Sequence, residues 1–243
     1  MTTLFISDLH LQPSQPRLLD ACLCFLDERA RGSDALYILG DLFEAWIGDD
    51  DDAVWINDFV AALQQLRASG TALYFMHGNR DFLLGKNFAA RCGMQLLSEA
   101  IVIDLYGRPA LLMHGDTLCT EDKDYLAFRA QVRNPQWQQM ALSTPLEQRR
   151  QLAAQLRQQS KMAASNKAAD IMDVTPAEVA RVIAENNVDL LIHGHTHRPA
   201  RHELIVNGQP AERIVLGDWR DGDCMWYVRA DRDKSIELIR HAI

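Results

Sequence analysis

The sequence has few cysteines, and their arrangement suits neither cross-linking nor metal binding by thiolates. Five occur in 243 residues, and no two form a Cys-x-x-Cys pair. Scattered thiols in odd number argue against a disulfide framework and against a thiolate zinc site. Long apolar runs are also missing, since no stretch approaches the length of about 20 residues that a transmembrane helix needs. The cysteines are Cys22, Cys24, Cys92, Cys119 and Cys224.

Basic residues are fewer than acidic residues. The chain has 25 Lys and Arg against 33 Asp and Glu, a net charge of -8, which disfavours a general nucleic-acid binder. Residues 1–8 lack the basic segment of a secretory signal and reach an acidic residue early. We therefore expect a cytoplasmic protein. Its composition, 48% hydrophobic and 24% charged, is that of an ordinary globular domain, long enough to carry an insertion.

A histidine-rich turn follows one apolar run. Leu190 to Ile192 predicts a buried strand, and the sequence continues as His-Gly-His-Thr-His. Side chains two apart in an extended segment point to the same side, so we expect His195 and His197 to point at one spot. Two neutral imidazoles suit a borderline divalent metal. The alternative is a surface turn that happens to be rich in histidine.

Four more predicted strands end at residues that can bind a metal. The carboxyl ends of strands are where sites form in open α/β sheets. Seven oxygen and nitrogen donors are too many for one ion, whereas two ions that share a carboxylate would fit. Such a centre keeps a net positive charge, holds a phosphate and lowers the pKa of bound water to near 7. The strands and donors are Thr3–Ser7 with Asp8 and His10, Ala35–Leu39 with Asp41, Ala72–Met76 with Asn79, and Ala110–Met113 with His114.

The order of predicted strands and helices along the chain indicates an α/β layered core. Helices alternate with the first strands, and hairpins are predicted around Tyr106–Pro109 and Asn207–Gly208. The acidic run Asp49–Asp52 is interpreted as a solvated loop and helix start. The other histidines have no partner in the pattern and are interpreted as structural: His77, His193, His202 and His241.

Residues 120–170 differ from the rest of the chain. They have almost no glycine, show helical periodicity and are rich in basic residues, in an otherwise acidic protein. We interpret them as a helical insertion whose basic side either is solvated or attracts anionic lipid headgroups. Its leucines indicate either helix packing or an acyl-chain groove: Leu142, Leu146, Leu152 and Leu156.

Five short motifs together resemble those of the calcineurin-like metallophosphoesterases: Asp8-x-His10, Gly40-Asp41, Gly78-Asn79-Arg80-Asp81, His114-Gly115-Asp116 and Gly194-His195-Thr196-His197. The resemblance implies a two-sheet sandwich flanked by helices. It also implies that Asp41 is shared by two metal ions. The first would be bound by Asp8, His10, Asp41 and His197, and the second by Asp41, Asn79, His114 and His195.

One residue departs from the broad family pattern. Arg80 stands where most members have a histidine that can help the leaving group. Arginine keeps its proton and is a poor general acid, but it is a good partner for phosphate oxygens. Cleavage of a pyrophosphate suits it, because the leaving group is a phosphate monoester with a second pKa of about 6. Arg80 would then stabilise transition-state charge. The alternative is a plain ion pair with Asp81.

Further segments resemble the UDP-2,3-diacylglucosamine hydrolases over essentially the whole chain: Phe43–Asp50, Asp116–Thr120 and Ile171–Val174. The resemblance implies a manganese-dependent pyrophosphatase of lipid A synthesis that yields UMP and 2,3-diacylglucosamine 1-phosphate (lipid X). It implies a core of residues 1–119 and 171–243, and a lid of residues 120–170 that shelters acyl chains. We expect a monomer bound peripherally to the cytoplasmic side of the inner membrane.

The same resemblance assigns roles to particular residues. Asp41, Asn79 and Arg80 would be catalytic. Tyr125 and Arg157 are additional candidates for substrate contact. The substrate-binding residues would be Asn79, Arg80, Asp122, Ser160, Lys167 and His195.

Three other functions remain open on the sequence. Another metallophosphoesterase would differ in substrate, but a phosphatase that expels an alkoxide should need an acid in place of Arg80. A nuclease is disfavoured by the acidic net charge. An inactive metal-binding scaffold would usually have lost a ligand, and none is missing.

Overall fold

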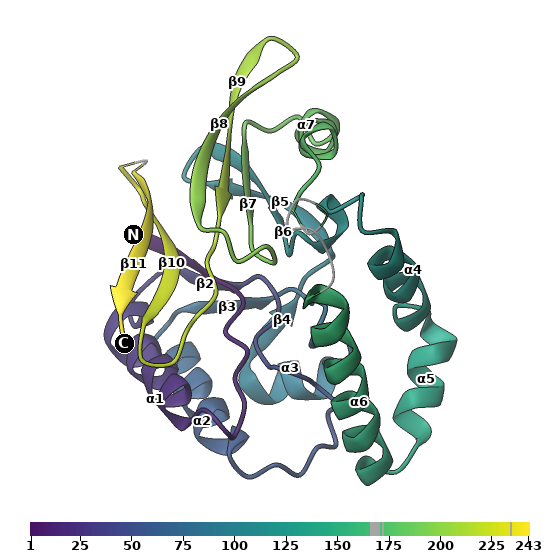
Figure 1. Ribbon diagram of the computed structural model, residues 1–243. Helices are drawn as coiled ribbons and strands as arrows, with labels where there is room; N and C mark the ends of the chain where they lie inside the picture. The colour runs from purple at the N-terminus through teal and green to yellow at the C-terminus, as the bar shows by residue number, and fades with distance from the viewer. Residues whose placement is uncertain (166–170, 172, 234) are drawn as a thin grey trace.

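The computed structural model describes residues 1–165, 171, 173–233 and 235–243, with the backbone alone for Lys161 and residues 163–165. Two β-sheets pack face to face between layers of helices, so the predicted two-sheet sandwich is confirmed (Figure 1). One sheet has the strand order β11-β10-β1-β2-β3-β4 and the other β5-β6-β7-β9-β8. The strands are β1 (Thr2–Ile6), β2 (Ala35–Ile38), β3 (Ala72–Phe75), β4 (Met94–Leu96), β5 (Ala100–Leu105), β6 (Arg108–Met113), β7 (Leu190–His193), β8 (Ala200–Val206), β9 (Gln209–Val215), β10 (Cys224–Asp231) and β11 (Ile236–Ala242).

The helices cover the outer faces of both sheets. In β1, Leu4 packs outward beneath α1 and α2, whereas Phe5 faces the other sheet. In β6, Leu112 lies between the sheets and Leu111 packs outward against α7. Each fully buried side chain of this size contributes about 1.5–3 kcal/mol. The helices are α1 (Pro16–Phe25), α2 (Ile56–Ala68), α3 (Lys86–Cys92), α4 (Lys123–Val132), α5 (Pro135–Ser143), α6 (Leu146–Ser165) and α7 (Pro176–Glu185), with short turns η1 (Leu26–Ala30) and η2 (Asp116–Leu118).

Parallel pairing brings the strand ends together. In the larger sheet β1, β2 and β3 are parallel, and in the smaller sheet β6 and β7 are parallel. Both predicted hairpins are confirmed, β5–β6 and β8–β9. Their turns have positive φ at Tyr106–Gly107 and Asn207–Gly208, which is the geometry of a two-residue hairpin turn.

The acidic run and helix α3 show an interaction that local patterns cannot predict. Asp49 accepts hydrogen bonds from the backbone N–H groups of Gly85 (2.8 Å) and Phe88 (2.9 Å), at the start of α3. The interpretation of this run as solvated therefore fits the exposed Asp50 and Asp52, but it is wrong for Asp49, whose carboxylate caps a helix distant in sequence. The short α3–β4 unit was not predicted, since its helix is only two turns long and its cap comes from Asp49.

Helices α4 to α6 confirm the helical insertion and form one side of the molecule (Figure 1). Most of its arginines pair with carboxylates of the core, so the basic side is largely neither solvated nor open to lipid headgroups. Within the described residues, no helix is long and apolar enough to cross a membrane. The pairs are Arg129 with Asp116 and Glu99, Arg133 with Glu99, Arg149 with Asp50, Arg150 with Asp51 and Asp52, and Arg157 with Glu44.

Arg149 fastens the insertion to the loop after β2. Its buried side chain contacts both carboxylate oxygens of Asp50 and donates to the backbone oxygens of Ile47 (2.6 Å) and Thr144 (3.0 Å). We expect Arg149→Ala to destabilise the protein by about 2 kcal/mol, because buried acceptors lose their donors. Hydrogen exchange in α5 and α6 should rise. Arg150→Ala removes only exposed ion pairs and should leave exchange and melting temperature unchanged.

Candidate metal centre and active site

The predicted ligands converge at one end of the sandwich. Each lies in the loop that follows a strand, and the five loops come from both sheets. Ligand atoms of Asp8, His10 and His197 lie within 4.8 Å of one another, and so do those of Asp8, Asp41 and His114. The structure therefore brings together residues that are up to 189 positions apart, as the strand ends predicted.

His195 and His197 reach the cluster through a backbone conformation other than the extended one predicted. Strand β7 ends at His193, and His195 and His197 lie beyond it in the left-handed region, with φ of 70° and 55°. They do not alternate along an extended segment, and they contact different parts of the cluster. Asp8, His10 and Asp41 have φ of 56°, 50° and 52°. Non-glycine residues in this region are strained, and such strain concentrates at functional sites.

Glycines next to the ligands allow the loops to pack this closely. A β-carbon on Gly78 would collide with the carboxylate of Asp41, and one on Gly194 would collide with Asp8 and Ser7. In the Gly-Asn and Gly-His motifs the second residue is a candidate ligand. The glycine before it leaves room for another candidate ligand, Asp41 beside Gly78 and Asp8 beside Gly194.

The first half of the cluster contains Asp8, His10 and His197. The Nε2 atoms of the two histidines lie 3.2 Å apart, and that of His197 lies 3.4 Å from Asp8 Oδ1. Outer carboxylates face both Nδ1 atoms: Glu44 at 3.4 Å from His10, and Asp218 at 3.6 Å from His197. Carboxylates in this position orient a metal-binding imidazole and raise its basicity.

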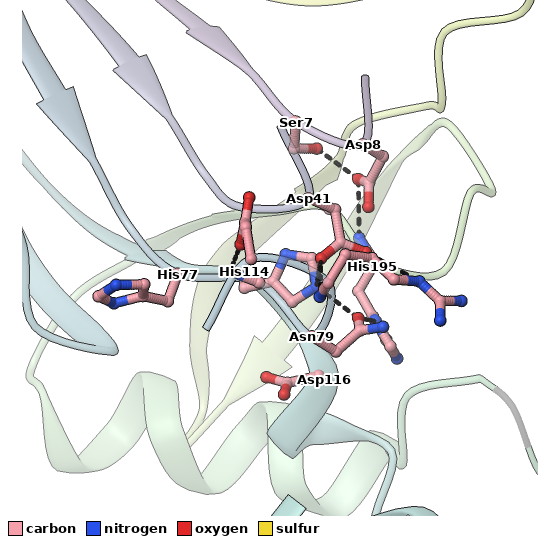
Figure 2. A network of polar contacts seen from close by, with 12 residues as sticks. Ser7, Asp8, Asp41, His77, Asn79, His114, Asp116 and His195 are labelled. Atoms are coloured by element: carbon pink, nitrogen blue, oxygen red, sulfur yellow. Dashed lines mark hydrogen bonds and ion pairs between the residues drawn. The ribbon is translucent and has the colours of Figure 1, made fainter. Parts of the chain in front are cut away.

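The second half contains Asp41, Asn79, His114 and His195. The Asn79 amide oxygen lies 3.0 Å from His114 Nε2 and 2.9 Å from His195 Nδ1 (Figure 2). His114 donates from Nδ1 to the carbonyl oxygen of Leu39 (2.8 Å), so its other ring nitrogen, Nε2, faces the cluster. Asp41 lies between the halves, with Oδ1 3.7 Å from His114 and Oδ2 4.0 Å from His10.

The donors fit divalent cations. Asp8 is fully buried, and its Oδ2 accepts from Ser7 (2.5 Å) and from the N–H of His195 (2.9 Å). Its Oδ1 is buried without a hydrogen-bond donor. Burial opposes a charged His197, but Asp8 outweighs it and raises the pKa of His197 to about 9. The site therefore favours positive charge where a metal would bind.

Asp81 positions these loops. It is fully buried, and its two oxygens accept from the N–H groups of Gly78 and Leu42, each at 2.8 Å. It thereby joins the loops after β2 and β3. Arg80 lies instead near Asp41 (Nε to Oδ2, 3.9 Å), so the alternative of an Arg80–Asp81 ion pair is wrong.

A cavity of about 560 Å³ extends from the cluster to the insertion. Its polar end is lined by Asn79, His195 and His197. Its apolar end is lined by α4–α6 and the loops facing them: Trp46, Ile47, Phe82, Leu83, Phe128, Trp137, Leu152 and Leu156. Two of the four leucines considered for an acyl groove therefore line the cavity, whereas Leu142 is exposed.

The residues predicted to contact substrate lie around this cavity. Arg80 donates to the hydroxyl of Ser160 (3.4 Å), and Asp122 caps α4 by accepting from Tyr125 N (3.0 Å). The buried hydroxyl of Tyr125 donates to Asp116 (2.5 Å). Arg157 pairs with Glu44. Burial opposes ionisation of Glu44, but its hydrogen bonds with His10 and Arg157 and the Arg157 charge outweigh burial and lower the pKa of Glu44 to about 2. Lys167, also predicted to bind substrate, lies outside the described residues.

Comparisons with known proteins agree with this geometry. The sequence profile of the calcineurin-like phosphoesterase family matches residues 1–199. The chain belongs to this family. A UDP-2,3-diacylglucosamine hydrolase of Cellvibrio japonicus is 61% identical over 226 residues, 93% of this chain and 94% of that protein. One of Marinobacter nauticus is 55% identical over 241 residues, 99% of this chain and 98% of that protein.

More distant matches include a solved archaeal phosphodiesterase. It aligns with a TM-score of 0.49 at 13% identity, over 99% of this chain and 100% of that chain.

Four positioning carboxylates of this phosphoesterase were not predicted: Glu44, Asp81, Asp116 and Asp218. Asp81 and Asp116 stand inside the recognised motifs, where their spacing from a ligand could have drawn attention to them. Asp218 stands outside every motif, and only the fold places it 3.6 Å from His197.

Proposed function

We propose that this phosphoesterase hydrolyses the pyrophosphate bond of UDP-2,3-diacylglucosamine. Water attacks the α-phosphorus and releases UMP and 2,3-diacylglucosamine 1-phosphate, a step of lipid A biosynthesis. The relatives that carry this name support the proposal, with 61% and 55% identity. The observation that carries it is the shared cavity, because one continuous space has a metal-ligand cluster at one end and an apolar wall at the other.

A substrate for such a cavity must be charged at one end and apolar at the other. A small phosphomonoester or a cyclic nucleotide would leave the wall of Phe82, Trp137 and Leu156 unused. Burying an alkyl chain there is favourable by about 0.8 kcal/mol for each CH₂. A diacylated nucleotide sugar uses both ends.

We propose two Mn²⁺ ions as cofactors, with Asp41 shared. Asp8, His10, Asp41 and His197 would hold one, and Asp41, Asn79, His114 and His195 the other. Mixed carboxylate, amide and imidazole donors suit several divalent metals, and manganese is the choice that the family resemblance favours. When bound, such ions supply a water of lowered pKa and neutralise phosphoryl oxygens.

Arg80 is proposed to stabilise the transition state. Its Nε–H is buried without an acceptor, and so is Nη1 of Arg157. A phosphoryl oxygen placed between them would satisfy donors that otherwise cost about 1–3 kcal/mol each. Burial lowers the pKa of Arg80, yet an arginine remains charged at neutral pH. The leaving phosphate monoester needs no proton from it.

The remaining roles are proposed from the same cavity. Asp41, Asn79 and Arg80 are assigned to catalysis. Asn79 serves as a ligand through its amide oxygen, which already faces His114 and His195. The residues assigned to substrate binding are Asn79, Arg80, Asp122, Ser160, Lys167 and His195.

We propose a core of residues 1–119 and 171–243 and a lid of residues 120–170. We also propose a monomer that binds peripherally to the cytoplasmic side of the inner membrane, where its diacylated substrate would reside. Because the arginines of the insertion are paired, we assign this binding to exposed apolar side chains of α5 and α6 that do not line the cavity: Met140 and Met162.

The direct test compares substrates. Manganese-loaded protein should cleave UDP-2,3-diacylglucosamine and should show a much lower kcat/KM for unacylated UDP-glucosamine. Equal kcat/KM values for the two substrates would contradict the proposed role of the apolar wall in binding acyl chains. Preference for a serine phosphate or for DNA would support a phosphatase or a nuclease instead. No hydrolysis of any phosphate ester would support an inactive scaffold.

The apolar wall can be tested separately. We expect Leu156→Arg to raise KM for the diacylated substrate about tenfold or more, because a charge replaces a side chain worth about 1.5–3 kcal/mol. The kcat/KM for unacylated UDP-glucosamine should stay the same. Leu142→Arg is the matched control, since Leu142 lies on the insertion but is exposed. Equal effects of both variants on KM would contradict the proposed acyl site.

A further inference from the structure

A second, smaller cavity lies behind the loop of residues 194–199, which joins β7 to β8 and is called the histidine loop below. Its volume is about 230 Å³, and it is distinct from the proposed substrate cavity. Thr196 and Arg198 line both cavities, so the loop between His195 and His197 forms part of the wall that separates them. The other lining residues come from the segment before α7, from the end of the histidine loop, and from β8 and β9: Asp173, Pro199, Ala200, His202, Arg213 and Val215.

Arg213 is the unusual residue in this cavity. Its side chain is only 9% exposed, and no carboxylate of the described residues lies within ion-pair distance of its guanidinium. Its hydrogen bond is to Nε2 of His193, at 3.4 Å. An imidazole carries no negative charge at neutral pH, so His193 cannot balance the charge of Arg213. A buried cation usually has an anionic partner.

The described residues that line the cavity carry more positive than negative charge. Among them Asp173 is the one carboxylate, and it pairs with Arg198. Burial, with the Arg213 charge beside it, lowers the pKa of His202 and keeps that imidazole neutral. The hydroxyl of Thr196 is buried without a hydrogen-bond partner and can donate. The cavity thus offers a planar guanidinium and a hydroxyl, which suit an oxyanion better than a halide.

We propose that this cavity binds a small oxyanion of the phosphate class, held by Arg213 with Thr196 and Arg198. The oxyanion would sit on the far side of the histidine loop from the substrate phosphates. Its source is either inorganic phosphate or the phosphate group of a small monoester. The proposal does not depend on the hydrolysis proposed above, and it is tested by binding alone.

Equilibrium dialysis of manganese-loaded protein with radiolabelled inorganic phosphate measures the number of sites. We expect the wild type to bind phosphate at one site more than Arg213→Gln, or at least about tenfold more tightly there. Arg201→Gln is the matched control, because Arg201 lies on β8 and already pairs with Glu212. Identical site numbers and affinities for the wild type and Arg213→Gln would overturn the proposal.

A second variant keeps the test valid if Arg213→Gln fails to fold. Ala200→Glu places a carboxylate at the cavity wall and should prevent phosphate binding there. Full phosphate binding by a folded Ala200→Glu protein would count against the site. Unlabelled glucose 1-phosphate separates the sources. If it displaces the Arg213-dependent label, a phosphomonoester can occupy the site, and if it does not, free phosphate is the ligand.

Discussion

Replacement of Arg80 by alanine is expected to lower kcat/KM by about 10³-fold, the range in which an arginine that stabilises phosphoryl-transfer charge acts. The side chain faces the cavity with an unpartnered Nε–H, and it reaches both Asp41 and Ser160. Arg80→Lys should recover only part of the loss, because an ammonium keeps the charge but lacks the planar fork. Steady-state kinetics with the diacylated substrate gives both values.

The control for Arg80 is an arginine of the insertion. Arg150→Ala removes the same charge from an exposed site that pairs with Asp51 and Asp52, and it should keep wild-type kcat/KM. Metal content should be the same in all three variants, since Arg80 is not a ligand. A loss of less than tenfold in Arg80→Ala would show that Arg80 does not act on the transition state.

Asp8→Asn is expected to have a comparable effect through the metal. The amide keeps the shape of the side chain but removes the negative charge from a fully buried oxygen. Loss of a carboxylate ligand removes several kcal/mol of metal-dependent stabilisation, which corresponds to a fall in kcat on the order of 10³. Elemental analysis after dialysis should show less than two equivalents of manganese.

The manganese affinities of two variants distinguish a metal ligand from a residue that only orients a ligand. Asp218 lies behind His197 and orients it, so Asp218→Asn should weaken manganese binding by about 10–100-fold, less than Asp8→Asn does. Circular dichroism of both variants checks the fold. If Asp8→Asn retained two equivalents of manganese with wild-type affinity, the assignment of Asp8 as a ligand would be wrong.

The convergence of these side chains can be predicted from the sequence because the signal is local. Each candidate ligand lies within a few residues of the end of a short apolar strand, so strand pattern and side-chain type can be read from the same segment. Parallel pairing then places Asp41 and Asn79 at one end of the larger sheet. The family motifs supply the division of ligands between two ions, which strand pattern alone leaves open.

The parts that were missed depend on contacts between distant segments. The cap of α3 comes from Asp49, and the arginines of the insertion have their carboxylates in the core. The expected alternation of His195 and His197 was also wrong. Their left-handed backbone lies beside Gly194, which packs against Asp8 in a contact between segments 186 residues apart.

The phosphorus atom that water attacks distinguishes the proposed reaction from its alternatives. Manganese-loaded protein should be incubated with UDP-2,3-diacylglucosamine in oxygen-18 water, and both products should be analysed by mass spectrometry, with Asn79→Ala as the inactive control. The proposed attack at the α-phosphorus predicts one label on UMP and none on the sugar 1-phosphate. Label on the sugar 1-phosphate, or no cleavage of this substrate, would contradict the account.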